Sequence, residues 1–111
     1  MPKFCYELWG TEVYISENGC AATDIMEPNG EILDTDRIMY MKHALGKYQQ
    51  AYADGIPIKG YFVWSLLDNF EWSSGFSFRY GLIYVNHRTL ERTLKWSARY
   101  YAACIRGNCV L

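Results

Sequence analysis

The feature that most constrains the fold is an unbroken apolar run, Tyr-Phe-Val-Trp at 61–64, which follows a long amphipathic pattern. Strands with one solvated face alternate polar and apolar residues, whereas strands of a parallel sheet, covered on both faces, are continuously apolar. Residues 58–65 are therefore predicted to form a strand covered on both faces. A second strand-like run, 12–16, precedes the amphipathic pattern. The order strand, helix, strand predicts a βαβ unit with an α/β fold.

The amphipathic pattern between the two runs predicts a helix over 34–55. Asp34 or Thr35 is a suitable N-cap, and Asp36 favours the first turn through the helix dipole. Gly55 suits the position just after the helix. The apolar side chains recur at three- and four-residue spacing and predict one buried stripe, made by Ile38, Met41, Leu45, Tyr48 and Tyr52.

Shorter elements flank this unit. The predicted elements are helical turns at 4–10, a long connection at 18–33 whose second Asn-Gly pair fits a small hairpin, a polar-aromatic loop at 66–81, strands at 82–85 and 90–94, and a helix at 95–106 ended by Gly107. No repeat or linker divides the chain. Its 111 residues therefore make at most one domain.

Composition excludes several classes of function. A net charge of −1 gives no reason to expect nucleic acid or an anionic membrane as a partner. No apolar run approaches the roughly 20 residues of a membrane span, and the first residues lack a signal peptide pattern, so a cytoplasmic protein is predicted. The cysteines, Cys5, Cys20, Cys104 and Cys109, form no metal-binding motif and are predicted to be reduced. No metal or cofactor is expected.

Two carboxylates follow the two predicted strands. Glu17 ends the first strand, and Glu71 lies in the loop after the second. Functional side chains in βαβ folds gather at the carboxyl ends of parallel strands, so both are predicted at one edge of the sheet. A competing interpretation is local, because Asn18-Gly19 is also a strong hairpin signal and would make Glu17 part of a turn.

The loop at 66–81 mixes aromatic and polar side chains. Trp64, Phe70 and Trp72 lie near Asp68, Asn69 and Glu71 in sequence. Aromatic faces stack on the C–H faces of sugars, while carboxylates and amides bind their hydroxyl groups, so the mixture suits a carbohydrate subsite. The alternative is that these aromatic rings pack against the protein itself, and composition does not choose between the two.

Two motifs resemble one family. Val-Tyr-Ile-Ser-Glu-Asn-Gly at 13–19 and Trp-Ser-Leu-Leu-Asp-Asn-Phe-Glu-Trp at 64–72, followed by Arg-Tyr-Gly at 79–81, resemble the C-terminal part of family 1 glycoside hydrolases, the β-glucosidase family. The resemblance implies a partial (β/α)8 barrel, its last two βα units, about a quarter of the barrel. The whole chain, 1–111, would then be a single C-terminal fragment of such a barrel.

The resemblance also implies roles. Glu17 matches the catalytic nucleophile of a retaining β-glycosidase. The substrate-binding set it implies consists of Trp64 under the sugar, Glu71 and Trp72 on its outer hydroxyls, Tyr80 lining the pocket, and Asn18 beside the nucleophile. The expected ligand is a β-glucoside or related small sugar.

A retaining glycosidase needs a second carboxyl group about 5–5.5 Å from the nucleophile, as acid and base. The family carries it in an Asn-Glu-Pro motif that this sequence lacks; Glu27-Pro28 follows Met26 with no strand before it and is interpreted as a coincidence. The chain is therefore predicted to be poorly active alone. Alternatives are a non-catalytic sugar-binding or scaffold module, or a piece that assembles into a multi-chain barrel.

Two strands cannot close a barrel. Their edges stay unpaired, and the inner-face side chains Tyr14 and Phe62 lack a partner layer, so the chain is predicted to self-associate or to bind a complementary barrel fragment. His43 is predicted to be solvated, and His87 is predicted to be a surface turn residue.

Overall fold

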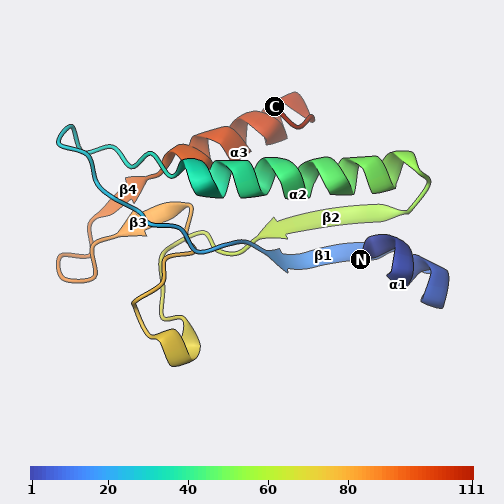
Figure 1. Cartoon of the computed structure of the whole chain (residues 1–111), viewed down its shortest axis with the longest axis horizontal. Helices are drawn as coiled ribbons and strands as arrows, with labels where there is room; N and C mark the ends of the chain where they lie inside the picture. Colours follow the sequence, from blue (N-terminus) through green and yellow to red (C-terminus); the bar gives the residue numbers. More distant parts are fainter.

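The computed structural model describes all residues, 1–111. The elements, in chain order, are α1 (Pro2–Trp9), β1 (Val13–Asn18), α2 (Thr35–Ala53), β2 (Ile58–Val63), the 3-10 helix η1 (Trp72–Ser74), β3 (Ile83–Val85), β4 (Arg92–Leu94) and α3 (Trp96–Gly107). Figure 1 shows α2 and α3 along one side of the β1–β2 sheet and the loop that contains η1 projecting on the opposite side.

The predicted βαβ unit is confirmed. Strands β1 and β2 pair in parallel, with Val13 opposite Ile58 and Asn18 opposite Val63, and α2 connects them. The hairpin interpretation of Asn18-Gly19 is wrong, because Asn18 is still part of the paired strand. The second Asn-Gly pair does close a small hairpin, with an antiparallel bridge between Met26 and Ile32 and Gly30 at φ 80°.

The remaining predicted elements are confirmed with small shifts at their ends. Strands β3 and β4 pair antiparallel as a hairpin. Gly10 ends α1 in a left-handed conformation, with its N–H donating to the carbonyl oxygen of Tyr6. Helix α3 ends at Gly107, one residue later than predicted, and Asn108 is its C-cap in a left-handed conformation.

One face of the β1–β2 sheet is open. Tyr14 and Phe62 are each 60% exposed, which confirms that their inner face has no partner layer within this chain. The prediction that residues 58–65 are covered on both faces is therefore wrong for this side. The two sheets have two strands each and form no closed barrel. The radius of gyration, 15.6 Å, exceeds the value of about 13 Å expected for a compact domain of this length.

The predicted stripe of α2 is buried only in part. Met41 is 1% exposed, Ile38, Leu45 and Tyr48 are half-buried, but Tyr52 is 65% exposed. Burial of Tyr52 was thus predicted wrongly. The reason is that an open groove of about 530 Å³ lies between α2, β2 and α3, and Tyr52 lines it together with Tyr48 and Tyr61.

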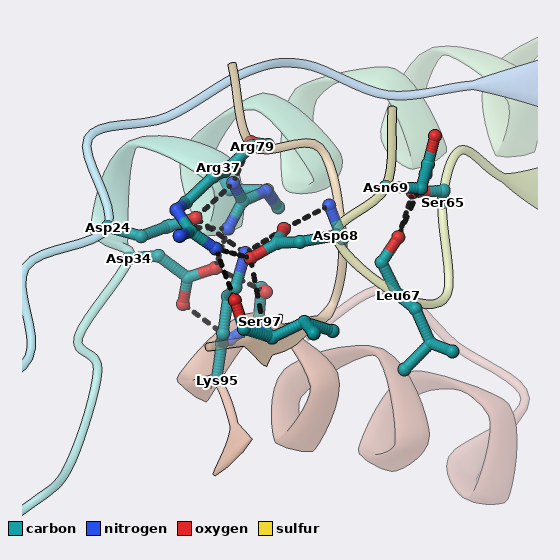
Figure 2. A network of polar contacts seen from close by, with 12 residues as sticks. Asp24, Asp34, Arg37, Ser65, Leu67, Asp68, Asn69, Arg79, Lys95 and Ser97 are labelled. Carbon is teal, nitrogen blue, oxygen red and sulfur yellow. Dashed lines mark hydrogen bonds and ion pairs between the residues drawn. The ribbon is translucent and has the colours of Figure 1, made fainter. Parts of the chain in front are cut away.

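The interior is unusually polar for a chain of this size. The buried apolar residues are Ile32, Met41, Ile56, Leu82, Val85 and Cys104, and the buried polar or charged residues are Asp34, Arg37, Ser65, Asp68, Glu71, Lys95 and Ser97. Buried charges are tolerated only when they are paired, and a connected polar network lies where the strand-end loops meet α2 and α3 (Figure 2).

All four cysteines are free thiols in this structure. The helices include none with the length and apolar character that crossing a bilayer requires. Nor do His, Cys, Asp and Glu side chains gather anywhere in a set of three or more that could hold a metal ion.

Candidate active site

Glu17 lies next to the carboxyl end of β1, and its side chain is solvent-exposed. The neighbouring strand β2 ends one residue before Trp64, whose N–H donates to the carbonyl oxygen of Asn18 at 2.9 Å. The strand ends that carry Glu17 and Trp64 are thus hydrogen-bonded side by side. This arrangement places both residues at the predicted edge of the sheet.

Glu71 is held against Trp64. The Trp64 indole N–H points at both carboxylate oxygens of Glu71, with distances from Nε1 of 3.2 and 3.4 Å. Glu71 is 9% exposed, and its backbone N–H donates to the carbonyl oxygen of Gly75 at 2.7 Å. The Trp64 ring and the Glu71 carboxylate are therefore held together as one hydrogen-bonded pair, the Trp64–Glu71 unit.

Trp72 and Tyr80 belong to the same loop. Trp72 is 79% exposed, so its ring is free to contact a ligand. Tyr80 is half-buried, and its carbonyl oxygen accepts a hydrogen bond from the Ser65 N–H at 3.2 Å. The Tyr80 end of the loop is thus bonded to Ser65, the residue after Trp64.

Asn18 has a different environment from the one predicted. Its Nδ2 donates to the Tyr40 hydroxyl at 2.9 Å, and its Oδ1 accepts from the Tyr61 hydroxyl at 2.9 Å. Tyr40 lies on α2 and Tyr61 on β2. Both polar groups of Asn18 are thus engaged by the protein, an arrangement that supports a role in fixing the end of β1 rather than in direct contact with a sugar.

The loop after β1 packs tightly on the end of β2. A Cβ atom on Gly19 would lie 1.7 Å from the carbonyl oxygen of Trp64, so only glycine fits there. The Ala22 N–H donates to the carbonyl oxygen of Arg79 at 3.3 Å. The loop that follows Glu17 therefore docks directly on the loop that carries Glu71.

Asp68 does not face a ligand. Its carboxylate accepts from Lys95 at 2.8 Å, from Arg79 at 2.6 Å, and from the N–H groups of Gly81 and Val85 at 3.0 and 3.3 Å. Burial alone would raise the pKa of this carboxyl, but these cations and hydrogen bonds outweigh it and hold the pKa below its ordinary value. Asp68 thereby fastens the two ends of the loop together.

Asn69 is similarly used by the protein, since its Nδ2 donates to the Ser65 hydroxyl and the Leu67 carbonyl oxygen. The sugar-binding interpretation of the loop at 66–81 therefore rests on Glu71 and the aromatic rings alone. The rings of Phe70, Phe76 and Phe78 are each more than half exposed, although Phe76 also packs edge-on against Phe70 and against the His87 ring, as the alternative required.

Sequence reasoning missed the network around Asp68. Six charged side chains balance in it: the carboxylates are Asp24, Asp34 and Asp68, and the cations are Arg37, Arg79 and Lys95. One signal was available, because Arg37 stands in the first turn of α2, where the helix dipole disfavours a cation. A cation placed there needs buried carboxylates as partners.

His87 is also placed differently from the prediction. Its ring stacks on Phe76, with centroids 4.5 Å apart, and its Nε2 is buried without a hydrogen-bond partner. His87 does lie in the turn between β3 and β4, as predicted, but it is half-buried instead of at the surface, because Phe76 packs on its ring. His43 is exposed, as predicted.

Comparison with known proteins assigns the chain to a family. The family model described as glycosyl hydrolase family 1 matches residues 3–110. β-Glucosidase A from Thermotoga maritima is 46% identical over 97 residues, which cover 87% of this chain and 22% of that protein. Human lactase/phlorizin hydrolase is 46% identical over 99 residues, covering 86% of this chain and 5% of that protein.

The structural comparison agrees. The family 1 β-glucosidase from Thermotoga maritima in complex with isofagomine lactam superimposes with a TM-score of 0.97 and 42% identity, covering 99% of this chain and 25% of that one. The chain thus spans a quarter or less of the relatives it matches. It belongs to glycosyl hydrolase family 1.

Proposed function

We propose that residues 1–111 are the nucleophile-bearing part of a retaining β-glycosidase of the β-glucosidase type. In this proposal they form the last two βα units of a (β/α)8 barrel, about a quarter of it. The observation that supports the proposal is the adjacency of the two strand ends: the Trp64 N–H donates to the carbonyl oxygen of Asn18, the residue after Glu17, and the Trp64 indole N–H donates to Glu71. Strand ends are rigid, as a nucleophile requires.

Glu17 is proposed as the nucleophile. Its carboxylate attacks the anomeric carbon of a β-glucoside while the bond to the leaving oxygen breaks, which forms a covalent glycosyl ester. Water then hydrolyses the ester and restores the carboxylate. The exposure of Glu17 leaves its oxygens free for this attack.

The sugar itself would be held by the loop after β2. Trp64 offers a ring face for stacking, and Glu71 accepts hydrogen bonds from sugar hydroxyls, with Trp72 and Tyr80 completing the subsite. Because Glu71 is already fixed by the indole of Trp64, contacts with hydroxyl groups cost little reorganisation and can strengthen toward the transition state. Asn18 is proposed to position the end of β1.

The acid that protonates the leaving oxygen is not supplied by a recognisable motif in this sequence. Hydrolysis by the isolated chain is therefore expected to be slow. Aryl β-glucosides with acidic phenols as leaving groups are the most sensitive substrates, because the phenolate departs without being protonated.

The test compares aryl β-glucoside hydrolysis by the wild-type chain, Glu17→Gln and Glu12→Gln. Glu12 is a matched control, since it is a 58% exposed glutamate before the opposite end of β1. Slow turnover that Glu17→Gln lowers by about a hundredfold or more, and that Glu12→Gln leaves unchanged, supports the proposal. Turnover that is equal in all three proteins refutes it.

A second candidate, a sugar-binding module without catalysis, is favoured by one observation: Trp72 is 79% exposed while the neighbouring Glu71 is fixed by the indole of Trp64. In that case glucose or a glucose analogue would bind equally to the wild-type chain and to Glu17→Gln. Titration followed by tryptophan fluorescence distinguishes the two candidates.

The open face of the sheet supports a further proposal, that the chain associates with copies of itself or with a complementary barrel fragment. Tyr14 and Phe62 on this face are each 60% exposed, and β1 and β2 each have an unpaired edge. Exposed apolar faces and strand edges are typical of interfaces.

A further inference from the structure

One side chain contacts both loops of the proposed site. The Arg37 guanidinium donates through Nε to the carbonyl oxygen of Cys20 at 3.4 Å, in the loop that follows Glu17. Through Nη2 it donates to the carbonyl oxygen of Arg79 at 2.7 Å, next to Tyr80 in the loop that carries Glu71. Figure 2 shows Arg37 between these segments, and Arg37 is 2% exposed.

The carbonyl group of Arg79 also joins the loop after Glu17 directly to the loop that carries Glu71. The oxygen of Arg79 accepts both from Arg37 and, at 3.3 Å, from the N–H of Ala22. A carbonyl oxygen has two lone pairs, so both bonds are made at once. Loss of the guanidinium bond would leave the Ala22 bond as the sole hydrogen bond at this oxygen.

The direction of the guanidinium is fixed by carboxylates. Asp24 takes a bidentate pair, with distances of 3.0 Å to Nη1 and 3.1 Å to Nη2, and Asp34 contacts Nη1. Asp24 and Asp34 have fully buried side chains. A planar fork with several donors can bind two carboxylates and two carbonyl groups together, whereas the ammonium group of a lysine cannot.

We propose that Arg37 is a positioning residue that sets the end of β1, with Glu17, relative to the Trp64–Glu71 unit. This inference rests on the proposed function for its consequence, but the geometric claim stands on the contacts alone. Placement matters because a shift of about 1 Å between reacting groups can cost about a hundredfold in rate.

The test is site-resolved amide exchange and nitrogen-15 NMR of the whole chain. Arg37→Lys keeps the charge but removes the fork, and Arg106→Lys, on an exposed arginine of α3, is the matched control. The measured signals are the exchange rates of the Ala22, Leu45 and Cys104 amides and the indole N–H resonance of Trp64.

In Arg37→Lys, the protection of the Ala22 amide is expected to fall about tenfold or more, while Leu45 and Cys104 in the two helices change by less than about twofold. The Trp64 indole resonance is expected to shift, because its bond to Glu71 moves with the loop. Arg106→Lys should change none of these signals. A residue that only stabilises the fold would lower all three protections by one common factor, and that result overturns the proposal.

A measurement on the wild-type chain decides the matter if Arg37→Lys does not fold. The Ala22 amide must exchange more slowly than that of exposed Thr23, its neighbour in the loop. Equal exchange of the two amides overturns the proposal. Neither exchange measurement uses turnover, so a chain that fails to hydrolyse glucosides refutes the proposed function without affecting this result.

Discussion

At the scale of single residues, Gly19 decides whether the loop after Glu17 can reach its place. A Cβ there would lie 1.7 Å from the backbone carbonyl oxygen of Trp64, which has no flexible group to move aside. We predict that Gly19→Ala lowers the free energy of unfolding by about 2 kcal/mol or more, measured by urea denaturation.

The matched control for this prediction is Gly46→Ala. Gly46 lies inside α2, and a Cβ there meets no atom within 4 Å. Alanine is the better helix former, so Gly46→Ala is expected to raise the free energy of unfolding by about 0.5–1 kcal/mol. Equal effects of the two substitutions would contradict the close approach of Gly19 to Trp64.

Asp68 makes stability depend on pH. Its pKa in the folded chain lies below the ordinary value of 3.8, so its charge stabilises the fold above about pH 4 and the stabilisation is lost as the pH falls through the folded value. Asp68→Asn is predicted to lower the free energy of unfolding by about 3 kcal/mol or more at neutral pH, because it removes the carboxylate that pairs with Lys95 and Arg79.

Urea midpoints measured across the acid range test this prediction. The urea concentration at the wild-type midpoint should decrease as the pH is lowered below about 4. The midpoint of Asp68→Asn should decrease less over the same pH range. An Asp68→Asn chain as stable as the wild type at neutral pH would show that the carboxylate is not holding the loop.

The site residues could be predicted unevenly from sequence. The position of Glu17 followed from strand direction and from a motif, both of which are local to the chain. The environments of Asn18 and Asp68 could not be predicted, because their partners lie on Tyr40, Tyr61 and Lys95, far away in sequence. A polar side chain looks the same in a sequence whether it meets ligand or protein.

At the scale of elements, the two long helices are linked through one carboxylate. Asp34 occupies the N-cap position of α2 but caps α3 instead, accepting from the Ser97 N–H at 2.9 Å and from the Ser97 hydroxyl. The Asp34 side chain is thus shared between the start of α3 and Arg37. The packing of α2 on α3 depends on it.

Ser97→Ala should therefore weaken the attachment of α3. Ser97 is fully buried, and loss of its hydroxyl removes one charge-assisted hydrogen bond, with an expected cost of about 1–2 kcal/mol in the free energy of unfolding. Ser73→Ala, on the exposed part of η1, is the control and should change stability by less than about 0.5 kcal/mol. A cost for Ser97→Ala no larger than that of the control would contradict this link.

Most elements were predictable because their signals are periodic or local, as in α2 with its apolar stripe and the following Gly55. The exposure of Tyr52 was not predictable from the pattern, and that of the inner face of β2 followed only from the resemblance to part of a barrel, not from the apolar run. An apolar pattern records what a segment is suited to pack against, not whether the partner is present in the same chain.

At the scale of the whole molecule, the main feature is the open face of the β1–β2 sheet. The side chains of Tyr14 and Phe62 give it an apolar surface. We predict that the chain has a solution mass greater than its 12.9 kDa at micromolar concentration, measured by size-exclusion chromatography with light scattering.

Phe62→Asp places a charge on this face and should shift the chain toward the monomer. Met39→Asp is the matched control, since Met39 is 72% exposed on α2, away from the sheet's open face. A wild-type chain that is monomeric at every concentration and melts cooperatively would show that the open face is tolerated in water.

Covalent trapping of a glycosyl ester tests whether Glu17 is the nucleophile. The chain is incubated with a 2-fluoro-β-glucoside that has a dinitrophenol leaving group. Dinitrophenolate departs without an acid, and the fluorosugar stays bound to the nucleophile as a slowly hydrolysed ester. Intact mass spectrometry and peptide mapping then locate the label. We expect one fluoroglucosyl group on Glu17, absent in Glu17→Gln and present in Glu12→Gln. A label on another residue, or none on a wild-type chain that binds the sugar, would contradict it.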